Sequence, residues 1–118
     1  MTTATIIRSA FWLGQPAPGF EDAFRTAIES EFLPGFGDLP GVLAARALWP
    51  LRREDDPPPV HCQVILEFAD EEGLAAMLAS PGRAALRSRV GELAARFDGR
   101  ISHIDYRVGA KDGSQRAE

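Results

Sequence analysis

Residues 60–68 read Val-His-Cys-Gln-Val-Ile-Leu-Glu-Phe and carry the clearest secondary-structure signal of the chain. Every second residue, from Val60 to Phe68, is apolar, and the residues between them are mostly polar. Because successive side chains of a strand point to opposite faces, this alternation predicts a strand with one buried face. The stretch 52–59 before it is charged and closes in three prolines, so we expect an exposed connector there.

Three further strands are predicted around this one. Residues 4–13 are rich in β-branched and aromatic types and end at a glycine and a proline. A second strand is expected at 42–51, and residues 100–108 alternate between apolar and polar types in the same way as 60–68.

Two helical segments separate these strands. Apolar residues at four-residue steps over 20–32 predict a first amphipathic helix, which we expect to end at Pro34-Gly35. Asp70 is placed to cap a second helix. This helix breaks and restarts at Ser80-Pro81 and is expected to end at Gly99.

The order strand, helix, strand, strand, helix, strand is the split βαβ pattern of a ferredoxin-like α+β sandwich. Right-handed crossovers then place the helices on one face of a four-stranded antiparallel sheet and leave the other face bare. On the bare face we expect Ile6, Ala10, Trp12, Ile65 and Ile101. Because monomers rarely expose a wide apolar surface, we expect a second copy of the chain to cover it, giving a homodimer.

Composition narrows the class of protein. The 118 residues, 45% of them hydrophobic, suit a single domain over 1–108 with a polar tail at 109–118. The net charge of -4 argues against nucleic acid or an anionic membrane as a partner. The single Cys62 excludes an internal disulfide, and no run of apolar residues is long enough to span a bilayer, so we expect a cytoplasmic protein. Lys111 is the lone lysine among many arginines, which suggests a GC-rich bacterial genome.

The span 4–108 resembles the dimeric α/β-barrel superfamily of small bacterial proteins, in which two sheets pack face to face. The resemblance rests on the element order, on the aromatic first helix running into Phe32-Leu33-Pro34, on the Pro40-Gly41 turn and on the Ser80-Pro81 break. Within that superfamily the chain is most similar to EthD-like and related uncharacterised members. The superfamily holds monooxygenases, isomerases, cyclases, haem-handling enzymes and proteins of no known activity, so the resemblance implies the fold and leaves the chemistry open.

Strong catalytic motifs are absent from the sequence: it has no P-loop, HExxH, GxSxG or Rossmann fingerprint. The glycines at 35–41 follow a predicted helix, so turn geometry explains them better than phosphate binding. Cys62 lies on the apolar side of its strand and is interpreted as a small buried hydrophobe, with a reactive thiol as the alternative.

Strand alternation supplies the candidate site. If the apolar sides of the third and fourth strands meet the helices, one set of polar side chains points to the bare face, namely His61, Gln63, Glu67, His103, Asp105 and Arg107. The first strand is apolar on both faces. If Ile7, Phe11 and Leu13 lie under the helices, Arg8 and Trp12 point to the same bare face, into the cavity that the two sheets of a dimer would enclose. Arg8 then lies between the strands that carry the two histidines.

His103 and Asp105 are the catalytic candidates. Residues two apart on a strand face the same side, so the carboxylate can orient the imidazole and make it a general base or acid near neutral pH. The alternative is an ion-pair network that holds a dimer together. A metal site is not expected, because the strands bearing His61 and His103 are not adjacent.

We therefore expect a homodimer that binds a small, partly apolar organic molecule between sheet and helices, with Arg8, Trp12, His61, Gln63 and Glu67 as ligand-binding residues. An enzyme with these groups would act as a cofactor-free monooxygenase or an isomerase, His103 serving as base and Arg8 stabilising an oxyanion. The alternatives are a non-catalytic accessory protein and a haem-handling protein. No cofactor is predicted.

Overall fold

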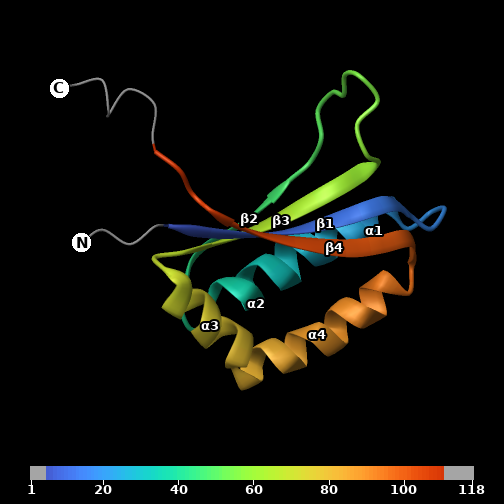
Figure 1. Ribbon diagram of the computed structural model, residues 1–118. Coiled ribbons are helices and arrows are strands. Elements are labelled where there is room, and N and C mark those ends of the chain that lie inside the picture. Colours follow the sequence, from blue (N-terminus) through green and yellow to red (C-terminus); the bar gives the residue numbers. More distant parts are fainter. Residues whose placement is uncertain (1–4, 111–118) are drawn as a thin grey trace.

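The computed structural model describes residues 5–110, which form one antiparallel sheet covered by helices on one face (Figure 1). The strands lie in the order β2-β3-β1-β4. Their bounds are β1 Ile6–Pro16, β2 Val42–Leu48, β3 Val60–Phe68 and β4 Phe97–Arg107. The helical bounds are α1 Glu21–Ala27, the π-helical turn η1 Ile28–Phe32, α2 Leu33–Gly37, α3 Glu71–Ala79 and α4 Pro81–Ala94. This is the predicted ferredoxin-like α+β fold. Residue 4 of the first predicted strand and most of the predicted tail lie outside the described residues.

The first helix continues past Pro34-Gly35, where we expected it to end. The π-helical turn η1 ends two residues before Pro34, and the backbone N–H of the residue that follows it, Leu33, donates to the carbonyl of Ile28, five residues back. A proline inside a regular α-helix removes a hydrogen bond and its ring clashes with the preceding turn. The wider turn accommodates the proline, so α2 extends to Gly37 and carries Phe36 over the sheet.

The predicted alternation of β3 is confirmed. Cys62, Val64, Leu66 and Phe68 are buried under the helices. Burial raises the pKa of the Cys62 thiol to about 12, so this side chain remains protonated and fills core volume.

Two predicted helix caps are also confirmed. The Asp70 carboxylate accepts the N–H of Gly73 at 2.9 Å, and the Ser80 hydroxyl accepts the N–H of Arg83 at 3.3 Å. These bonds satisfy N–H groups that the first turns of α3 and α4 would otherwise leave without partners. The Asp70 cap marks the start of α3, and the Ser80 cap marks the break between α3 and α4.

The prediction of which side chains of β1 and β4 point toward the helices is wrong. Arg8, Trp12 and His103 lie under the helices, and so do Ile6, Ala10, Ile101, Asp105 and Arg107. Ile104 and Tyr106 face the uncovered side instead. In β1 both faces carry apolar residues, so hydrophobic alternation does not distinguish the two orientations. In β4 the alternation is present, but its apolar residues Ile104 and Tyr106 lie on the uncovered side of the sheet.

His61 is a further correction, because it does not point to the uncovered face. Trp12 pairs with Cys62 but the next residue, Leu13, pairs with Val60, which leaves His61 as the extra residue of a β-bulge. Its ring centroid lies 5.4 Å from that of Phe24 and 6.0 Å from that of Phe97, both in edge-to-face geometry, and it also packs near Trp49. His61 is thus part of an aromatic cluster at one end of the core.

The uncovered face of the sheet is partly apolar. Gln63 and Glu67 lie on it as predicted, and the Ser9 hydroxyl donates to the Gln63 side-chain oxygen at 2.9 Å. Large apolar side chains there are substantially exposed, namely Leu48 at 42%, Ile104 at 46%, Tyr106 at 42% and Val108 at 46%. The connector 49–59 projects from the sheet on this side (Figure 1). Within residues 5–110, no helix is long and apolar enough to cross a membrane.

Gly99 lies inside β4, although we expected it to mark the end of the second helix. It pairs with Gly14 of β1, and both adopt positive φ, +152° and +127°. A Cβ on Gly14 would lie 2.1 Å from the Asp98 carbonyl oxygen, and one on Gly99 would lie 1.9 Å from that of Leu13. The two strands can therefore approach this closely only with glycine at both positions.

We predict that Gly14→Ala and Gly99→Ala each lower the free energy of unfolding by about 2 kcal/mol or more, measured by urea denaturation. Gly91→Ala is the matched control. Gly91 lies in α4, and a Cβ at this position would have no other atom within 4 Å. That change should raise stability by about 0.5–1 kcal/mol. Equal stabilities for Gly14→Ala and the parent chain would contradict the close strand contact.

Candidate functional site

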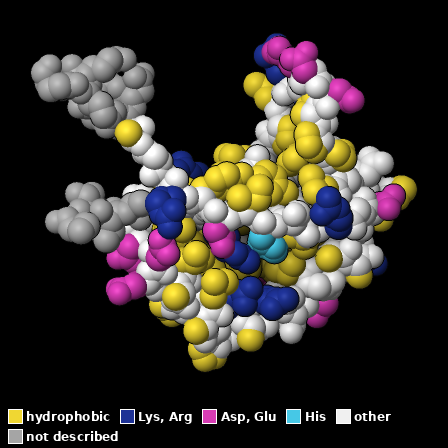
Figure 2. All heavy atoms as spheres, in the orientation of Figure 1, with side chains coloured by type: hydrophobic (Ala, Val, Ile, Leu, Met, Phe, Trp, Pro, Cys, Tyr) yellow, Lys and Arg dark blue, Asp and Glu magenta, His cyan; other side chains and the backbone are white. Residues whose placement is uncertain are grey.

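A cavity of about 410 Å³ lies between the sheet and the helices. Its walls are mostly apolar, with four basic side chains among them. The lining residues are Arg8, Ala10, Trp12, Ile28, Phe32, Phe36, Val64, Leu66, Met77, Arg83, Arg87, Val90, Gly91, Ile101 and His103. Figure 2 shows a hollow at the open edge of the molecule, bordered by a histidine and by basic side chains. The volume falls in the range of about 300–1,000 Å³ typical of small-molecule sites.

The floor of the cavity is built around Ala10, in the central strand β1. In the neighbouring strands its partners are Val64 and His103, so these three residues form one row across the sheet. Along β1 the larger side chains of Arg8 and Trp12 stand on either side of this row. The single methyl group of Ala10 leaves room between them.

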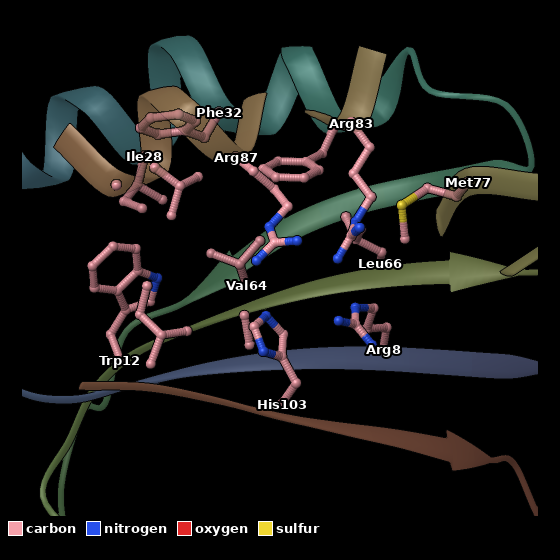
Figure 3. A pocket seen from close by; sticks show the side chains of 15 residues that line it. Arg8, Trp12, Ile28, Phe32, Val64, Leu66, Met77, Arg83, Arg87 and His103 are labelled. Carbon is pink, nitrogen blue, oxygen red and sulfur yellow. The ribbon is translucent and has the colours of Figure 1, made fainter. Parts of the chain in front are cut away.

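Trp12 closes one end of the cavity and is held by other aromatic rings. Its centroid lies 5.1 Å from that of Phe24 and 5.2 Å from that of Phe97, both in edge-to-face geometry. Ile28 and Phe32 of η1 lie over this end (Figure 3). The apolar part of a ligand would therefore contact rigid walls.

Arg8 and Asp105 form an ion pair across β1 and β4. One Arg8 Nη contacts both Asp105 oxygens, at 2.8 and 3.1 Å, and the two residues are direct partners in the sheet. The side chain of Arg8 is only 17% exposed, against 39% for Asp105. The carboxylate therefore orients the guanidinium, whose remaining N–H groups are available to the cavity.

His103 lies next to this pair and remains accessible to solvent at the cavity opening. Partial burial lowers its pKa below the ordinary histidine value. Arg8 lowers it further, Asp105 acts in the opposite direction, and Arg83 and Arg87 add smaller effects that lower it. The imidazole is therefore neutral at pH 7 and can accept a proton.

Arg83 and Arg87 lie one helical turn apart on α4 and point toward Arg8 and His103 (Figure 3). In the described part of the chain neither forms an ion pair with a carboxylate. The Arg83 guanidinium makes only a long contact of 3.5 Å with the Leu78 carbonyl oxygen. The α4 wall of the cavity is thus strongly basic.

The structure brings together only some of the predicted site residues. Arg8, Trp12 and His103 line the cavity, and Asp105 contacts Arg8. The remaining three, His61, Gln63 and Glu67, do not line it. Among residues 5–110 no three His, Cys, Asp or Glu side chains converge as metal ligands would.

Sequence reasoning missed Phe36, Arg83 and Arg87. Phe36 was missed because Pro34 predicts the end of the helix. The two arginines are not singled out from the sequence, although their spacing of four residues, continued by Val90 and Gly91, marks one face of α4. That spacing was the available signal.

Comparisons with known proteins place this site in a recognised fold. No family model matches the chain, and no curated protein matches it. Among solved structures, an EthD family protein of Bacillus halodurans has a TM-score of 0.70 at 11% identity, covering 89% of this chain and 99% of that one. The expected EthD-like resemblance is confirmed for the fold.

Two other structures extend this comparison. SnoaB of Streptomyces nogalater, described as a cofactor-independent oxygenase, has a TM-score of 0.63 at 16% identity and covers 94% of this chain and 99% of that one. A dimeric ferredoxin-like protein of unknown function from Jannaschia has a TM-score of 0.62 at 20% identity, covering 88% of this chain and 99% of that one. At these identities the likeness concerns the fold alone.

We predict that His103 titrates below about 6.5 in an NMR pH titration of its ring protons. Arg83→Gln and Arg87→Gln should each raise its pKa, because each removes a neighbouring positive charge, whereas Asp105→Asn should lower it. The unfolded chain then binds this proton more readily than the folded chain, so the contribution of His103 to stability falls as the pH drops below the unfolded pKa.

The second histidine is the internal control for this titration. Burial and the charge of Arg53 lower the pKa of His61, and neither Arg83 nor Arg87 is among the causes. Its titration should therefore stay unchanged in the Arg83 and Arg87 variants. A His103 pKa that does not respond to either arginine would contradict the geometry of the α4 wall.

Proposed function

We propose that this protein binds a small, partly apolar organic molecule between sheet and helices and removes a proton from a carbon next to a carbonyl group. One observation carries the proposal: a neutral imidazole, His103, and an oriented guanidinium, Arg8, open into the same largely apolar cavity. A base and an oxyanion stabiliser at one site are the two groups that such a proton transfer requires.

In the proposed step the imidazole of His103 accepts the proton, so the C–H bond breaks and an N–H bond forms. The electron pair moves into the carbonyl system and leaves an enolate, whose oxygen accepts a hydrogen bond from Arg8. Asp105 does not touch the reacting atoms in this scheme. It is a positioning residue that holds the guanidinium in the direction of the cavity.

The enolate has two chemical outcomes. Return of the proton to a different carbon gives an isomer. Addition of dioxygen to the carbanion gives a peroxide anion, which takes the proton back from the His103 imidazolium and becomes a hydroperoxide. The hydroperoxide loses water and leaves a new carbonyl when the carbon carries a second hydrogen. The fold likeness to SnoaB, described as a cofactor-independent oxygenase, supports the second outcome as a candidate here.

We further propose that the reaction uses no cofactor and takes place in the cytoplasm. Support for the first part comes from the fold likeness to SnoaB, a cofactor-independent oxygenase. Support for the second comes from Cys62, the only cysteine of the chain, which is a free thiol in the core.

A test of the chemistry is the exchange of the acidic C–H protons of 2-tetralone, a bicyclic aromatic ketone, in D2O followed by NMR. We expect the protein to accelerate this exchange and His103→Gln to slow the protein-catalysed rate by about 100-fold or more. Ala10→Phe should abolish both binding and exchange, because it fills the floor of the cavity.

Arg89→Gln is the matched control for this experiment. Arg89 lies on α4 but pairs with Glu31 outside the cavity, so its replacement should leave exchange unchanged. An exchange rate that is the same in His103→Gln and in the parent chain would rule out His103 as the base. Binding of 2-tetralone without exchange would instead indicate the alternative function, a non-catalytic binding protein.

We also propose that a second copy of the chain covers the uncovered face of the sheet. The exposed side chains Ile104, Tyr106 and Leu48 form an apolar surface there. Desolvating such a surface favours association, and a self-complementary patch leads to a closed two-fold dimer. The structurally similar Jannaschia protein, which is described as dimeric, supports the proposed dimer.

Replacing Ile104 with lysine should shift the protein from dimer to monomer in sedimentation equilibrium at micromolar concentration. A charge placed in the centre of an apolar interface has no partner there and opposes its desolvation. Ala85→Lys, at an exposed position of α4, is the control and should leave association unchanged. A parent chain that sediments as a monomer would contradict the proposed dimer.

A further inference from the structure

The α4 wall carries positive charge that the described residues do not balance. Of the cavity arginines, Arg8 has its counter-ion in Asp105. Arg83 and Arg87 have none within residues 5–110, and Arg83 is partly buried. Burial, together with the charges of Arg87 and Arg8, lowers the pKa of Arg83, as expected for cations that crowd one another. An anion at this position would relieve that repulsion.

The two guanidiniums are also arranged to act together. They come from consecutive turns of one helix and extend to the same part of the cavity, opposite the strands that bear Arg8 and His103 (Figure 3). Met77 and Leu66 lie beside Arg83 in the cavity (Figure 3), and Arg83 is partly buried, whereas Arg87 is exposed. A charge-assisted hydrogen bond from the partly desolvated guanidinium of Arg83 is stronger than it would be in water.

The opposite end of the cavity has the contrary character. Trp12, Ile28 and Phe32 form a wall without charged groups (Figure 3), and the small side chain of Ala10 lies in the floor between Trp12 and Arg8. A ligand that satisfies both ends has an aromatic body at the Trp12 end and an anionic group at the α4 end.

We infer that Arg83 and Arg87 form a carboxylate-binding subsite and that the substrate is an aromatic or fused-ring carboxylic acid. This inference rests on the proposed function and deepens it. The carboxylate lies under α4, and the acidic carbon lies beside His103, so the two arginines position the substrate without taking part in the proton transfer. Their effect is on affinity and on the choice of substrate.

A carboxylate fits these surroundings better than a phosphate does. Guanidinium groups match the planar carboxylate with parallel hydrogen bonds, and one negative charge suffices to offset most of the local repulsion. Phosphate sites commonly add backbone N–H groups from a glycine-rich loop or a free helix N-terminus. The N-terminus of α4 is already capped by the Ser80 side chain.

The test uses isothermal titration calorimetry at pH 7.5 with three probes that share one ring system: naphthalene-2-carboxylate, the neutral 2-naphthamide and 2-naphthyl phosphate. We expect the carboxylate to bind about 10-fold more tightly than the amide, which has nearly the same shape. In the double variant Arg83→Gln/Arg87→Gln this preference should disappear through loss of carboxylate affinity, while amide affinity changes by less than about twofold.

Arg89→Gln is the control on the same helix and should keep the full preference, since Arg89 lies outside the cavity. Thermal melting of the double variant confirms that it folds, and the single variants serve in its place if it does not. An unchanged preference in the double variant would overturn the subsite. Tighter binding of the phosphate than of the carboxylate would overturn the choice of anion.

Failure of the inference and failure of the proposed function give different results. If the amide binds and Ala10→Phe blocks it, but the carboxylate has no advantage, the cavity binds ligands and only the subsite is wrong. If none of the three probes binds to the parent chain, or if Ala10→Phe binds them equally well, the cavity is not the binding site and both proposals fail.

Discussion

The central strand β1 determines where a ligand can bind, because it pairs with β3 on one side and β4 on the other and its side chains form the floor of the cavity. Arg8, Ala10 and Trp12 share one face of this strand, at intervals of two residues. A shift of one residue in its register would place Ile7, Ser9 and Phe11 on this face and would remove Arg8 and Trp12 from the cavity. The extended pairing of β1 with both β3 and β4 prevents that shift, so the cavity is a consequence of strand register.

Register also explains the distribution of charge in the site. The same pairing that sets Ala10 beside His103 sets Arg8 beside Asp105, so one guanidinium obtains its carboxylate from the adjacent strand. Helix α4 contributes the cations Arg83 and Arg87 to the cavity lining and no carboxylate. Unbalanced charge at a partly buried position opposes folding slightly and favours binding of a complementary group, which is the usual relation between a binding site and the stability of its scaffold.

The sequence predicted the fold more completely than the site, and the reason lies in particular residues. Residues 60–68 are apolar on one face only, so their orientation follows from hydrophobicity. In β1 both faces are apolar, and in β4 the apolar residues Ile104 and Tyr106 face the uncovered side, so the orientation of both strands is set by pairing with neighbours that periodicity does not reveal. The nature of the site residues was predicted better than their position: Arg8, Trp12 and His103 line a cavity between sheet and helices, but strand alternation had assigned them to the bare face of the sheet.

The π-helical turn is the remaining element that shapes the cavity, and its role follows from geometry. The apolar row Phe20, Phe24, Ile28, Phe32 and Phe36 has steps of four residues, and in a regular α-helix of 3.6 residues per turn each step rotates the side chain by about 40°. Continued without correction, this drift would turn Phe36 away from the sheet. The wider turn at Ile28–Phe32 opposes the drift, so Ile28, Phe32 and Phe36 all line the cavity. The proline that ends the predicted helix thus coincides with the irregularity that keeps the aromatic row over the binding site.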